Sequence, residues 1–381
     1  MAIDASLTWP TPRSAYIHVP FCRHRCGYCN FSVIADRDDL IDRYLRAIDA
    51  ELALLQRPTI DTLFIGGGTP THFRDEALRR FFGIVSQRFA LAPGYEWTIE
   101  ANPEDIDDET LDVIATAGVN RVSLGVQSFH DPKLQTLERG HSGEIATTVV
   151  RKVADMIENV SIDLIFAAPN ESVSQWRSDL ETALSLPITH LSTYALTYEK
   201  GTQFWNRKLR GELSPASETA EVAMYELARQ ITADDGLEHY EISSFARPEK
   251  QCRHNIAYWE GRGWYAAGPG AARFVRGVRE GNHRSTTTYL KRIESNQSPV
   301  AESEPIAWEQ HARERAAFGI RMLRGIDLSE IGVQTGIDLH QLLDDSITQL
   351  QAQGLVERTG HHVQLTHDGV MFADMVAREF L

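Results

Sequence analysis

Three cysteines lie within eight residues near the N-terminus, close enough together to bind a metal site. Cys22, Cys26 and Cys29 follow a C-x3-C-x2-C spacing, while the fourth cysteine, Cys252, is far away in the sequence. Structural zinc sites are closed by four protein ligands, usually in two pairs, and no second pair follows here. A [4Fe–4S] cluster held by three thiolates leaves one iron open for an exogenous ligand, so the spacing favours such a cluster. Zinc with His24 as a fourth ligand, or plain buried thiols, remain alternatives.

The segments around these thiols predict how the chain positions them. Residues 14–19 alternate polar and apolar side chains, which predicts a strand that ends at Pro20. Further strands are predicted at 62–65, 96–100, 121–125, 160–166 and 190–194, with helices between them. Such alternation predicts a parallel sheet with right-handed crossovers. Six units within roughly 190 residues are too few for a closed eightfold barrel of about 250 residues, so we expect an α/β fold with an open, partial (β/α)6 barrel.

The remainder of the chain predicts two smaller regions. We expect the barrel in residues 1–200, a smaller and irregular α+β region in 201–300, and a C-terminal domain in 301–381. In the last region an amphipathic helix from Leu339 to Leu350 precedes two short strands around a turn at 359–361, which is typical of a winged helix. Acidic residues outnumber basic ones there, so we expect a lid or packing domain rather than a DNA-binding one.

The composition narrows the classes of function. The chain has 381 residues and a formal net charge of -15, which argues against nucleic-acid binding because that needs a basic surface. Its apolar runs are too short for a transmembrane helix. Residues 1–11 lack the basic and apolar stretches of a secretory signal. Clustered cysteines fit a reducing compartment, so we predict the cytoplasm.

Several residues suited to ligand binding lie where the predicted strands end, which is where parallel sheets bind ligands. Successive glycines at 66–68 let a backbone approach a ligand closely, although a tight turn would also explain them. Glu100 and Gln127 end the third and fourth strands, and a solvated loop cap is the alternative for Glu100. Asp163 lies inside an apolar strand and therefore needs a partner. Arg139 is either a carboxylate-binding residue or an ordinary surface arginine.

The thiol motif, with the aromatic Tyr28 just before its last cysteine, resembles that of the radical S-adenosylmethionine (SAM) superfamily. The resemblance implies the partial barrel and a [4Fe–4S] cluster held by Cys22, Cys26 and Cys29. It also implies that SAM chelates the open iron through its amino and carboxylate groups. An electron from the cluster would then cleave SAM to a 5′-deoxyadenosyl radical.

A series of segments resembles, more narrowly, the oxygen-independent coproporphyrinogen III oxidase family. The segments are YIHVPFC at 16–22, GGGTPT at 66–71, IEANPE at 99–104, SLGVQSF at 123–129, IDLIF at 162–166 and TYALTYE at 193–199. Carried over position by position, the resemblance implies one SAM site lined by Tyr16, Gly67, Glu100 and Ala195. The residues matching a second SAM site of the oxidase are Tyr28, Gly68, Thr69, Gln127, Arg139 and Asp163.

Two departures from the oxidase pattern point to its sister group of heme chaperones. The oxidase has a fourth cysteine where this chain has Phe31, and a long N-terminal extension where this chain has about fifteen residues. The heme chaperones also carry an H-N-x-x-Y-W motif, which is present here from His254 to Trp259.

His254 is the heme-binding residue that this motif predicts. A neutral imidazole is a good axial ligand for heme iron, and Tyr258 and Trp259 offer flat apolar surface to a macrocycle. Three arginines nearby in the sequence are candidates to bind the propionates: Arg253, Arg262 and Arg273. The residues alone favour instead a histidine that caps a turn beside packed aromatic side chains, since a single histidine is weak evidence for a ligand.

Residues and resemblance together favour a heme chaperone on a radical SAM scaffold. A [4Fe–4S] cluster, SAM and heme are its expected cofactors, and a heme-accepting protein and an electron donor its expected partners. The alternative is the oxidase itself, which decarboxylates two propionates of coproporphyrinogen III. A third hypothesis is a DNA-binding winged-helix protein with an iron–sulfur sensor. We expect a heme carrier rather than an oxidase that turns over a porphyrin.

Overall fold

Six parallel strands form the centre of a twelve-stranded sheet in the computed structural model, which describes residues 7–381. Residues 1–6, part of the segment where no secretory signal is predicted, lie outside the described part. The six strands are β1 (Ser14–Val19), β4 (Thr59–Gly67), β5 (Ala90–Ala101), β6 (Arg121–Gln127), β7 (Asn159–Phe166) and β8 (His190–Ala195). Their order in the sheet follows their order in the chain, as expected for consecutive right-handed crossovers.

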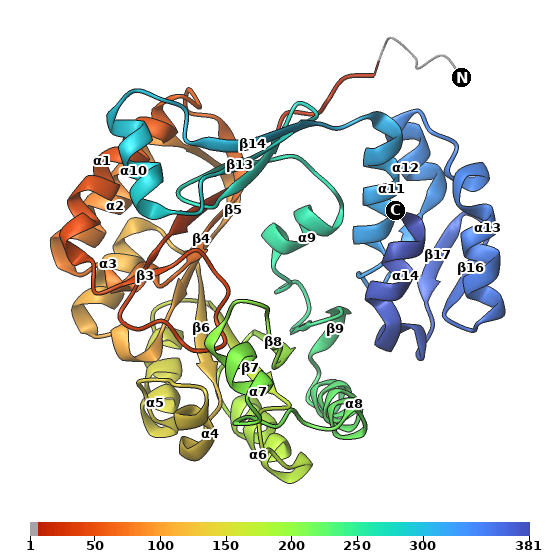
Figure 1. Ribbon diagram of the computed structural model, residues 1–381, viewed down its shortest axis with the longest axis horizontal. Coiled ribbons are helices and arrows are strands. Elements are labelled where there is room, and N and C mark those ends of the chain that lie inside the picture. The colour runs from red at the N-terminus through yellow and green to blue at the C-terminus, as the bar shows by residue number, and fades with distance from the viewer. Residues whose placement is uncertain (1–6) are drawn as a thin grey trace.

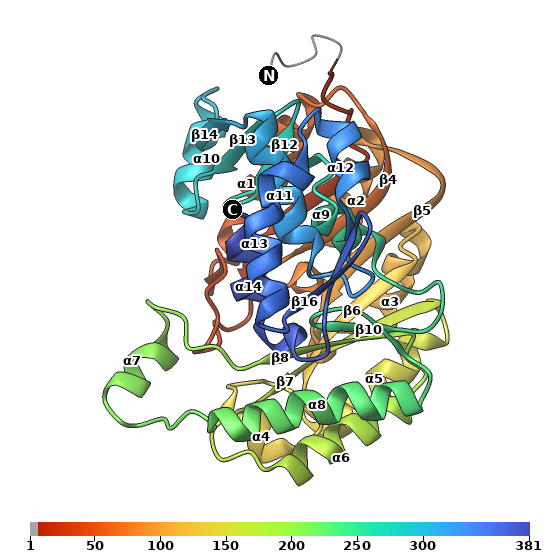
Figure 2. The same cartoon turned by 90° about the vertical axis from the view of Figure 1, so that its right-hand side faces the viewer.

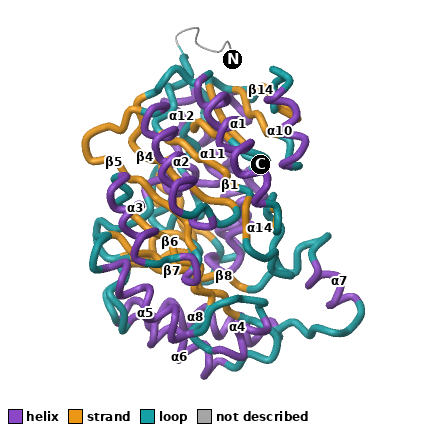
Figure 3. Tube along the Cα trace, turned by 90° about the vertical axis from the view of Figure 1, so that its left-hand side faces the viewer, coloured by secondary structure: helices purple, strands orange, loops and turns teal. Residues whose placement is uncertain are grey.

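Helices cover the outer face of these strands (Figures 1 and 3). The helices are α1 (Ile41–Ala53), α2 (Asp75–Arg88), α3 (Asp108–Ala117), α4 (Asp131–Thr136), α5 (Gly143–Ala154) and α6 (Val173–Leu184), with short 3-10 helices η1 (Asp38–Leu40), η2 (Pro70–His72) and η3 (Pro103–Asp105). Their apolar stripes, with Ile48 and Leu78 among them, pack on outward-facing strand residues such as Ile65. The predicted α/β class and partial barrel are confirmed.

Residues 201–305 extend this sheet at both ends. Beyond β8 lie the antiparallel strands β10 (Ser244–Ala246) and β9 (Glu238–Glu241). Beside β1 lie the parallel β11 (Trp264–Ala267) and then the antiparallel β12 (Ala272–Val275), β13 (Val278–Asn282) and β14 (Val300–Pro305). The helices of this part are α7 (Gln203–Leu209), α8 (Glu218–Asp234), α9 (Arg253–Trp259) and α10 (Thr286–Glu294). The sequence predicts a long helix at 217–234, which α8 confirms, but it does not predict the short strands. The boundaries at 200 and 300 stay a prediction.

The C-terminal part has the order of a winged helix. Helices α11 (Trp308–Gly319), α12 (Leu328–Thr335) and α13 (Leu339–Ala352) precede the hairpin β16 (Val356–Thr359) and β17 (His362–Leu365), and β15 (Ile326–Asp327), η4 (Gly369–Phe372) and α14 (Ala373–Phe380) complete it. It lies beside the barrel on the side of α9 and β9 (Figures 1 and 2), where the Leu323 N–H donates to the Tyr240 carbonyl at 3.0 Å. Within residues 7–381, no helix has the length and apolar character needed to cross a membrane.

Candidate functional site

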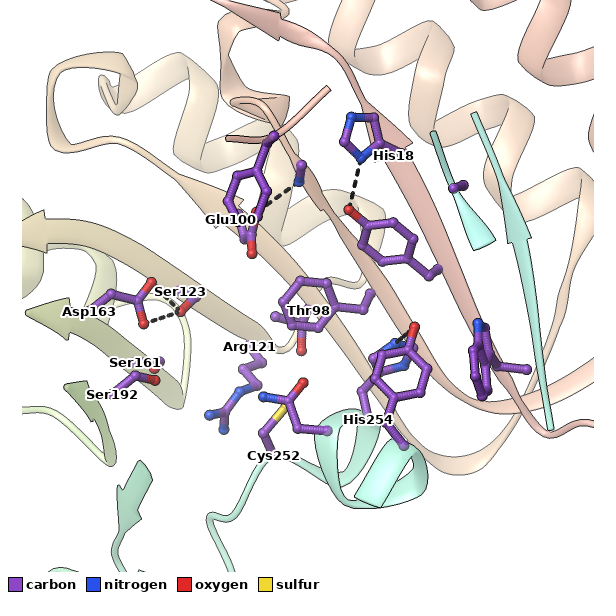
Figure 4. Close-up of a pocket in the computed structure, with 18 of the residues that line it drawn as sticks. His18, Thr98, Glu100, Arg121, Ser123, Ser161, Asp163, Ser192, Cys252 and His254 are labelled. Carbon is purple, nitrogen blue, oxygen red and sulfur yellow. Dashed lines mark hydrogen bonds between the residues drawn. The ribbon is translucent and has the colours of Figure 1, made fainter. Parts of the chain in front are cut away.

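Alternate residues of the parallel strands point into the barrel and line a cavity of about 550 Å³, the barrel cavity (Figure 4). Two chemically different walls face each other across it. The polar wall comes from β5 to β8 and contains Thr98, Glu100, Arg121, Ser123, Ser161, Asp163, His190 and Ser192. The aromatic wall comes from β1, β4, α9 and β11 and contains Tyr16, Phe64, His254, Tyr258 and Trp264.

The three clustered thiols line a second cavity of about 300 Å³, the thiol cavity. The small strands β2 (Phe21–Cys22) and β3 (Ile34–Ala35) hold the two ends of the thiol loop together, and the Cys29 N–H donates to the Cys26 carbonyl at 3.0 Å. Within residues 7–381, no three histidine, cysteine or carboxylate side chains are arranged to hold a single metal ion. Thiols that surround a cavity without meeting at one point fit a cluster, because each thiolate then binds a different iron.

The thiols need a compensating charge to become metal ligands. Burial raises the pKa of Cys22 to about 12 and also raises the pKa of Cys29. Only thiolates bind metal, so binding must displace protons from these side chains. Two donors already point at sulfur: Arg139 Nη1 lies 3.7 Å from the Cys26 Sγ, and Thr69 Oγ1 lies 3.6 Å from the Cys22 Sγ. Both donors would stabilise a negative charge on these sulfur atoms.

The glycine loop after β4 is packed against the thiol loop. Gly67 has a φ of 109°, and its N–H donates to Glu100 Oε2 at 2.9 Å. A Cβ at Gly68 would lie 2.6 Å from the carbonyl oxygen of Phe21, so this position excludes every larger residue unless the backbone moves. The glycines therefore allow the two backbones to approach each other closely, and the glycine loop lines both cavities.

Besides Phe31, four residues line both cavities, so the cavities adjoin: Gly67, Glu100, Ser123 and Asp163. Burial raises the pKa of Glu100 to about 7 and that of Asp163 to about 6. The Ser123 hydroxyl donates to Asp163 Oδ2 at 3.3 Å. Phe31, with 64% of its surface exposed, also borders both cavities. Two carboxyl groups that ionise near neutral pH are thus placed between the thiols and the barrel cavity.

The structure brings most of the predicted SAM residues together. The residues that line the thiol cavity are Tyr28, Gly67, Gly68, Thr69, Glu100, Gln127, Arg139 and Asp163. Arg139 is no surface arginine, because its guanidinium donates to Asn102 Oδ1 and to the Gly125 carbonyl, at 2.5 and 2.9 Å. Tyr16 lines the barrel cavity instead, and Ala195, at the end of β8, lines neither cavity. The individual roles of these residues stay predictions.

His254 lies on the aromatic wall at the start of α9. Burial lowers its pKa to about 3, so the imidazole is neutral at physiological pH, as an iron ligand must be. Both ring nitrogens are hydrogen-bonded: Nδ1 lies 3.0 Å from the Thr62 hydroxyl and Nε2 lies 2.9 Å from the Tyr258 hydroxyl. Iron bound at Nε2 would therefore have to displace the Tyr258 hydroxyl.

The three arginines predicted to lie near heme are engaged elsewhere. Arg253 donates to the Gly94 carbonyl, Arg262 pairs with Glu260, and Arg273 pairs with Glu280. None of them lines the barrel cavity, whereas Arg121 does. Sequence reasoning missed Arg121 and the serines of the polar wall. The signal that could have found them is polar residues at alternate positions inside buried strands, as in Arg121–Ser123 and Ser161–Asp163.

Comparisons with known proteins agree on one family. The Radical SAM superfamily matches residues 16–183, and the HemN C-terminal domain matches residues 307–372. The heme chaperone HemW of Bacillus subtilis is 32% identical over 97% of this chain and 99% of its own length. HemW of Mycobacterium tuberculosis H37Rv is 35% identical, with 97% and 95% covered, and HemW of Escherichia coli K12 is 30% identical, with 97% and 98% covered.

One solved structure shares nearly the whole fold. The coproporphyrinogen III oxidase HemN of Escherichia coli, described as a radical SAM enzyme, superimposes with a TM-score of 0.86 at 20% identity. The match covers 97% of this chain and 90% of that chain. At this identity the likeness concerns the fold.

Proposed function

The chain belongs to the HemW family of radical SAM proteins, and we propose on this basis that it binds heme and delivers it to an acceptor protein. The observation that carries the proposal is 32–35% identity to curated heme chaperones across almost the entire chain. The geometry supports it, because a neutral imidazole on an aromatic wall borders a cavity of a size that suits a cofactor, within the usual range of roughly 300–1,000 Å³.

The residues around the thiol cavity fit the cofactors of a radical SAM domain. Cys22, Cys26 and Cys29 would hold three irons of a [4Fe–4S] cluster, and the fourth iron would have no protein ligand from this loop. When both are bound, the reduced cluster supplies an electron to SAM. The Gly67–Thr69 loop and Glu100 border the space that SAM would occupy, and Arg139 places a positive charge next to the cluster thiolates.

On the heme side, His254 would supply the axial ligand and the aromatic wall the packing surface. Tyr258 has two roles in this proposal: its hydroxyl holds the imidazole in place before binding, and it must rotate away when iron takes Nε2. Glu96 of β5 accepts hydrogen bonds from the backbone N–H groups of Arg253 and His254 at 3.0 Å, which fixes the start of α9 against the barrel.

The test is anaerobic reconstitution followed by heme titration. Iron and sulfide analysis should give a cluster in the full chain, and Cys22→Ser should lose it. His254→Ala should weaken heme binding or shift the Soret band, whereas His367→Ala, which alters an exposed histidine outside both cavities, should change neither. A protein that binds no heme, or that binds it equally well without His254, would contradict the respective part of the proposal.

The second candidate is the oxidase reaction, and the adjoining cavities are what favour it. A ligand in the barrel cavity would lie next to the SAM space across Glu100 and Asp163, as a reaction would require. Incubation with SAM, reductant and coproporphyrinogen III distinguishes the two functions. Turnover to protoporphyrinogen would favour the oxidase.

A heme-accepting protein and an electron donor are the partners that this function requires. We also propose the cytoplasm as the compartment, because three unpaired thiols in one loop persist as metal ligands only where disulfides are not formed.

A further inference from the structure

Arg121 is a buried cation without a counter-ion in the described chain. It is the first residue of β6, and 3% of its surface is exposed. Its guanidinium has five N–H groups, yet among residues 7–381 it makes one hydrogen bond, from Nη1 to the Lys250 carbonyl at 3.1 Å. It takes part in no ion pair within this range. A buried charge is costly unless it is paired, so an unpaired guanidinium at a cavity wall indicates a missing anion.

The surroundings of Arg121 are suited to receive such an anion. Ser161 and Ser192 line the same polar wall (Figure 4), and the Thr98 hydroxyl is fully buried without a hydrogen-bond partner among residues 7–381. The charged or titratable groups that also face it are Asp163, His190, Cys252 and Tyr240. None of these forms an ion pair with it. The Ser161 hydroxyl is shared with His190 Nδ1 at 2.8 Å and the Ser192 hydroxyl with the Asp163 carboxyl, so the free donors that an incoming anion would meet are the N–H groups of Arg121.

The position of Arg121 in the barrel limits the shape of the ligand. Arg121 and Gly125 lie on the same strand, four residues apart, which corresponds to about 13 Å, and Gly125 borders the thiol cavity. The anion would therefore bind far from the thiols, opposite the aromatic wall. A molecule that fits both walls has a flat apolar body and a carboxylate arm.

We infer that Arg121 is the anchor for a carboxylate of the ligand in the barrel cavity, which for heme is a propionate. This inference rests on the proposed function and adds the residue that orients the bound molecule: the macrocycle lies on the aromatic wall with His254, and a propionate forms an ion pair with Arg121. Bidentate pairing of a guanidinium with a carboxylate fixes direction as well as affinity.

The experiment compares heme with its dimethyl ester, in which both propionates are masked. The full-length protein with its cluster reconstituted is titrated anaerobically with each, and Kd is taken from the Soret change. Wild type should bind the free acid about tenfold or more tightly than the ester, as expected for a hydrogen-bonded charge. Arg121→Gln should lose this preference by weakening only the free acid, and Arg121→Lys should retain part of it.

Arg284 provides the matched control. It also lines the barrel cavity, but its guanidinium donates to the Ser32 hydroxyl and the Asn30 carbonyl, at 3.2 and 2.8 Å. Arg284→Gln should keep the preference for the free acid. Equal affinity of wild type for heme and ester, or loss of the preference in Arg284→Gln alone, would overturn the role of Arg121 and leave heme binding intact.

Two other results are also decisive. If wild type binds neither compound, the proposed function fails together with the inference. If Arg121→Gln does not fold, the titrations of wild type, Arg121→Lys and Arg284→Gln still decide the question. A preference for the free acid that Arg121→Lys leaves unchanged and Arg284→Gln abolishes would assign the carboxylate to Arg284.

Discussion

At the scale of single residues, burial gives the site its chemistry. The cysteine spacing predicts the thiol site, because three ligands in one loop are close in space whatever the rest of the chain does. Arg121 could not be predicted in the same way. The role proposed for it rests on the lack of an ion-pair partner among residues 7–381, which only the packed strands reveal.

Because of Glu100, we expect the free energy of unfolding of the cofactor-free protein to depend on pH. Burial raises its pKa from 4.5 to about 7, so the protonated carboxyl stabilises the fold below about pH 4.5, and this contribution is lost as pH rises towards about 7. Glu100→Gln keeps an acceptor for the Gly67 N–H but cannot ionise. The stability of the variant relative to wild type should therefore increase between about pH 5 and pH 8, by on the order of 2 kcal/mol. Melting curves at both pH values measure this, and a constant difference would contradict it.

We expect a larger residue at Gly68 to destabilise the protein, and Gly83 provides a control position. A Cβ at Gly68 would lie 2.6 and 2.8 Å from the carbonyl oxygens of Phe21 and Val19, which are backbone atoms and cannot rotate away. Gly68→Ala should therefore lower Tm and reduce iron incorporation, at a cost of about 1–3 kcal/mol. A Cβ at Gly83, inside α2, meets nothing within 4 Å, so Gly83→Ala should stabilise the protein by about 0.5–1 kcal/mol. Similar effects of the two substitutions would refute this account.

At the scale of elements, the strong periodic patterns were predictable and the short strands were not. The strand predicted at 96–100 belongs to β5, which already begins at Ala90. The strand runs through Pro93 and Gly94, a pair of residues that normally indicates a turn. Its pairing with β4 contains a register shift between Ile60 and Thr62, which accommodates this interruption. Strands β9 to β13 have three to five residues, too few for alternation to be recognised, and they form because an existing sheet edge offers backbone partners.

The start of helix α9 is stabilised by a residue that is far away in the sequence. Its N-cap residue Cys252 makes no capping hydrogen bond, and Glu96 of β5 takes that role for the N–H groups of Arg253 and His254. Glu96→Ala should lower stability by about 1–2 kcal/mol and also weaken heme binding, because His254 loses its position. Ser217 caps α8 in the usual way, because its hydroxyl accepts a hydrogen bond from the Ala220 N–H. Ser217→Ala removes this cap. It should cost a similar amount of stability without affecting heme. Equal heme affinity in both variants would disprove the positioning role of Glu96.

At the scale of the whole molecule, the C-terminal part shares the order of a winged helix but not the charge of a DNA-binding one. Residues 301–381 contain thirteen acidic and six basic side chains. The sequence predicted α13 and the hairpin of this part correctly, because the spacing of leucines in α13 and the turn at Gly360 are strong local signals. Its placement beside α9 could not be predicted, because it depends on long-range contacts such as the one between Leu323 and Tyr240.

The charge leads to a prediction about nucleic acid. The full chain should show no salt-dependent retardation of duplex DNA, because net negative charge repels phosphates and releases no counter-ions. A gel-shift series from about 50 to 200 mM salt measures this, with a basic winged-helix protein as the positive control. Binding that weakens steeply with salt would favour the sensor hypothesis instead.

The wall common to the two cavities has a thermodynamic consequence. Any molecule that orders Gly67, Glu100, Ser123 and Asp163 from one side changes the surface met by a molecule on the other side. By linkage, the factor by which SAM alters the Kd for heme must equal the factor by which heme alters the Kd for SAM. A factor different from one would mean that occupation of the thiol cavity changes how tightly the barrel cavity holds its ligand, without any bond being broken.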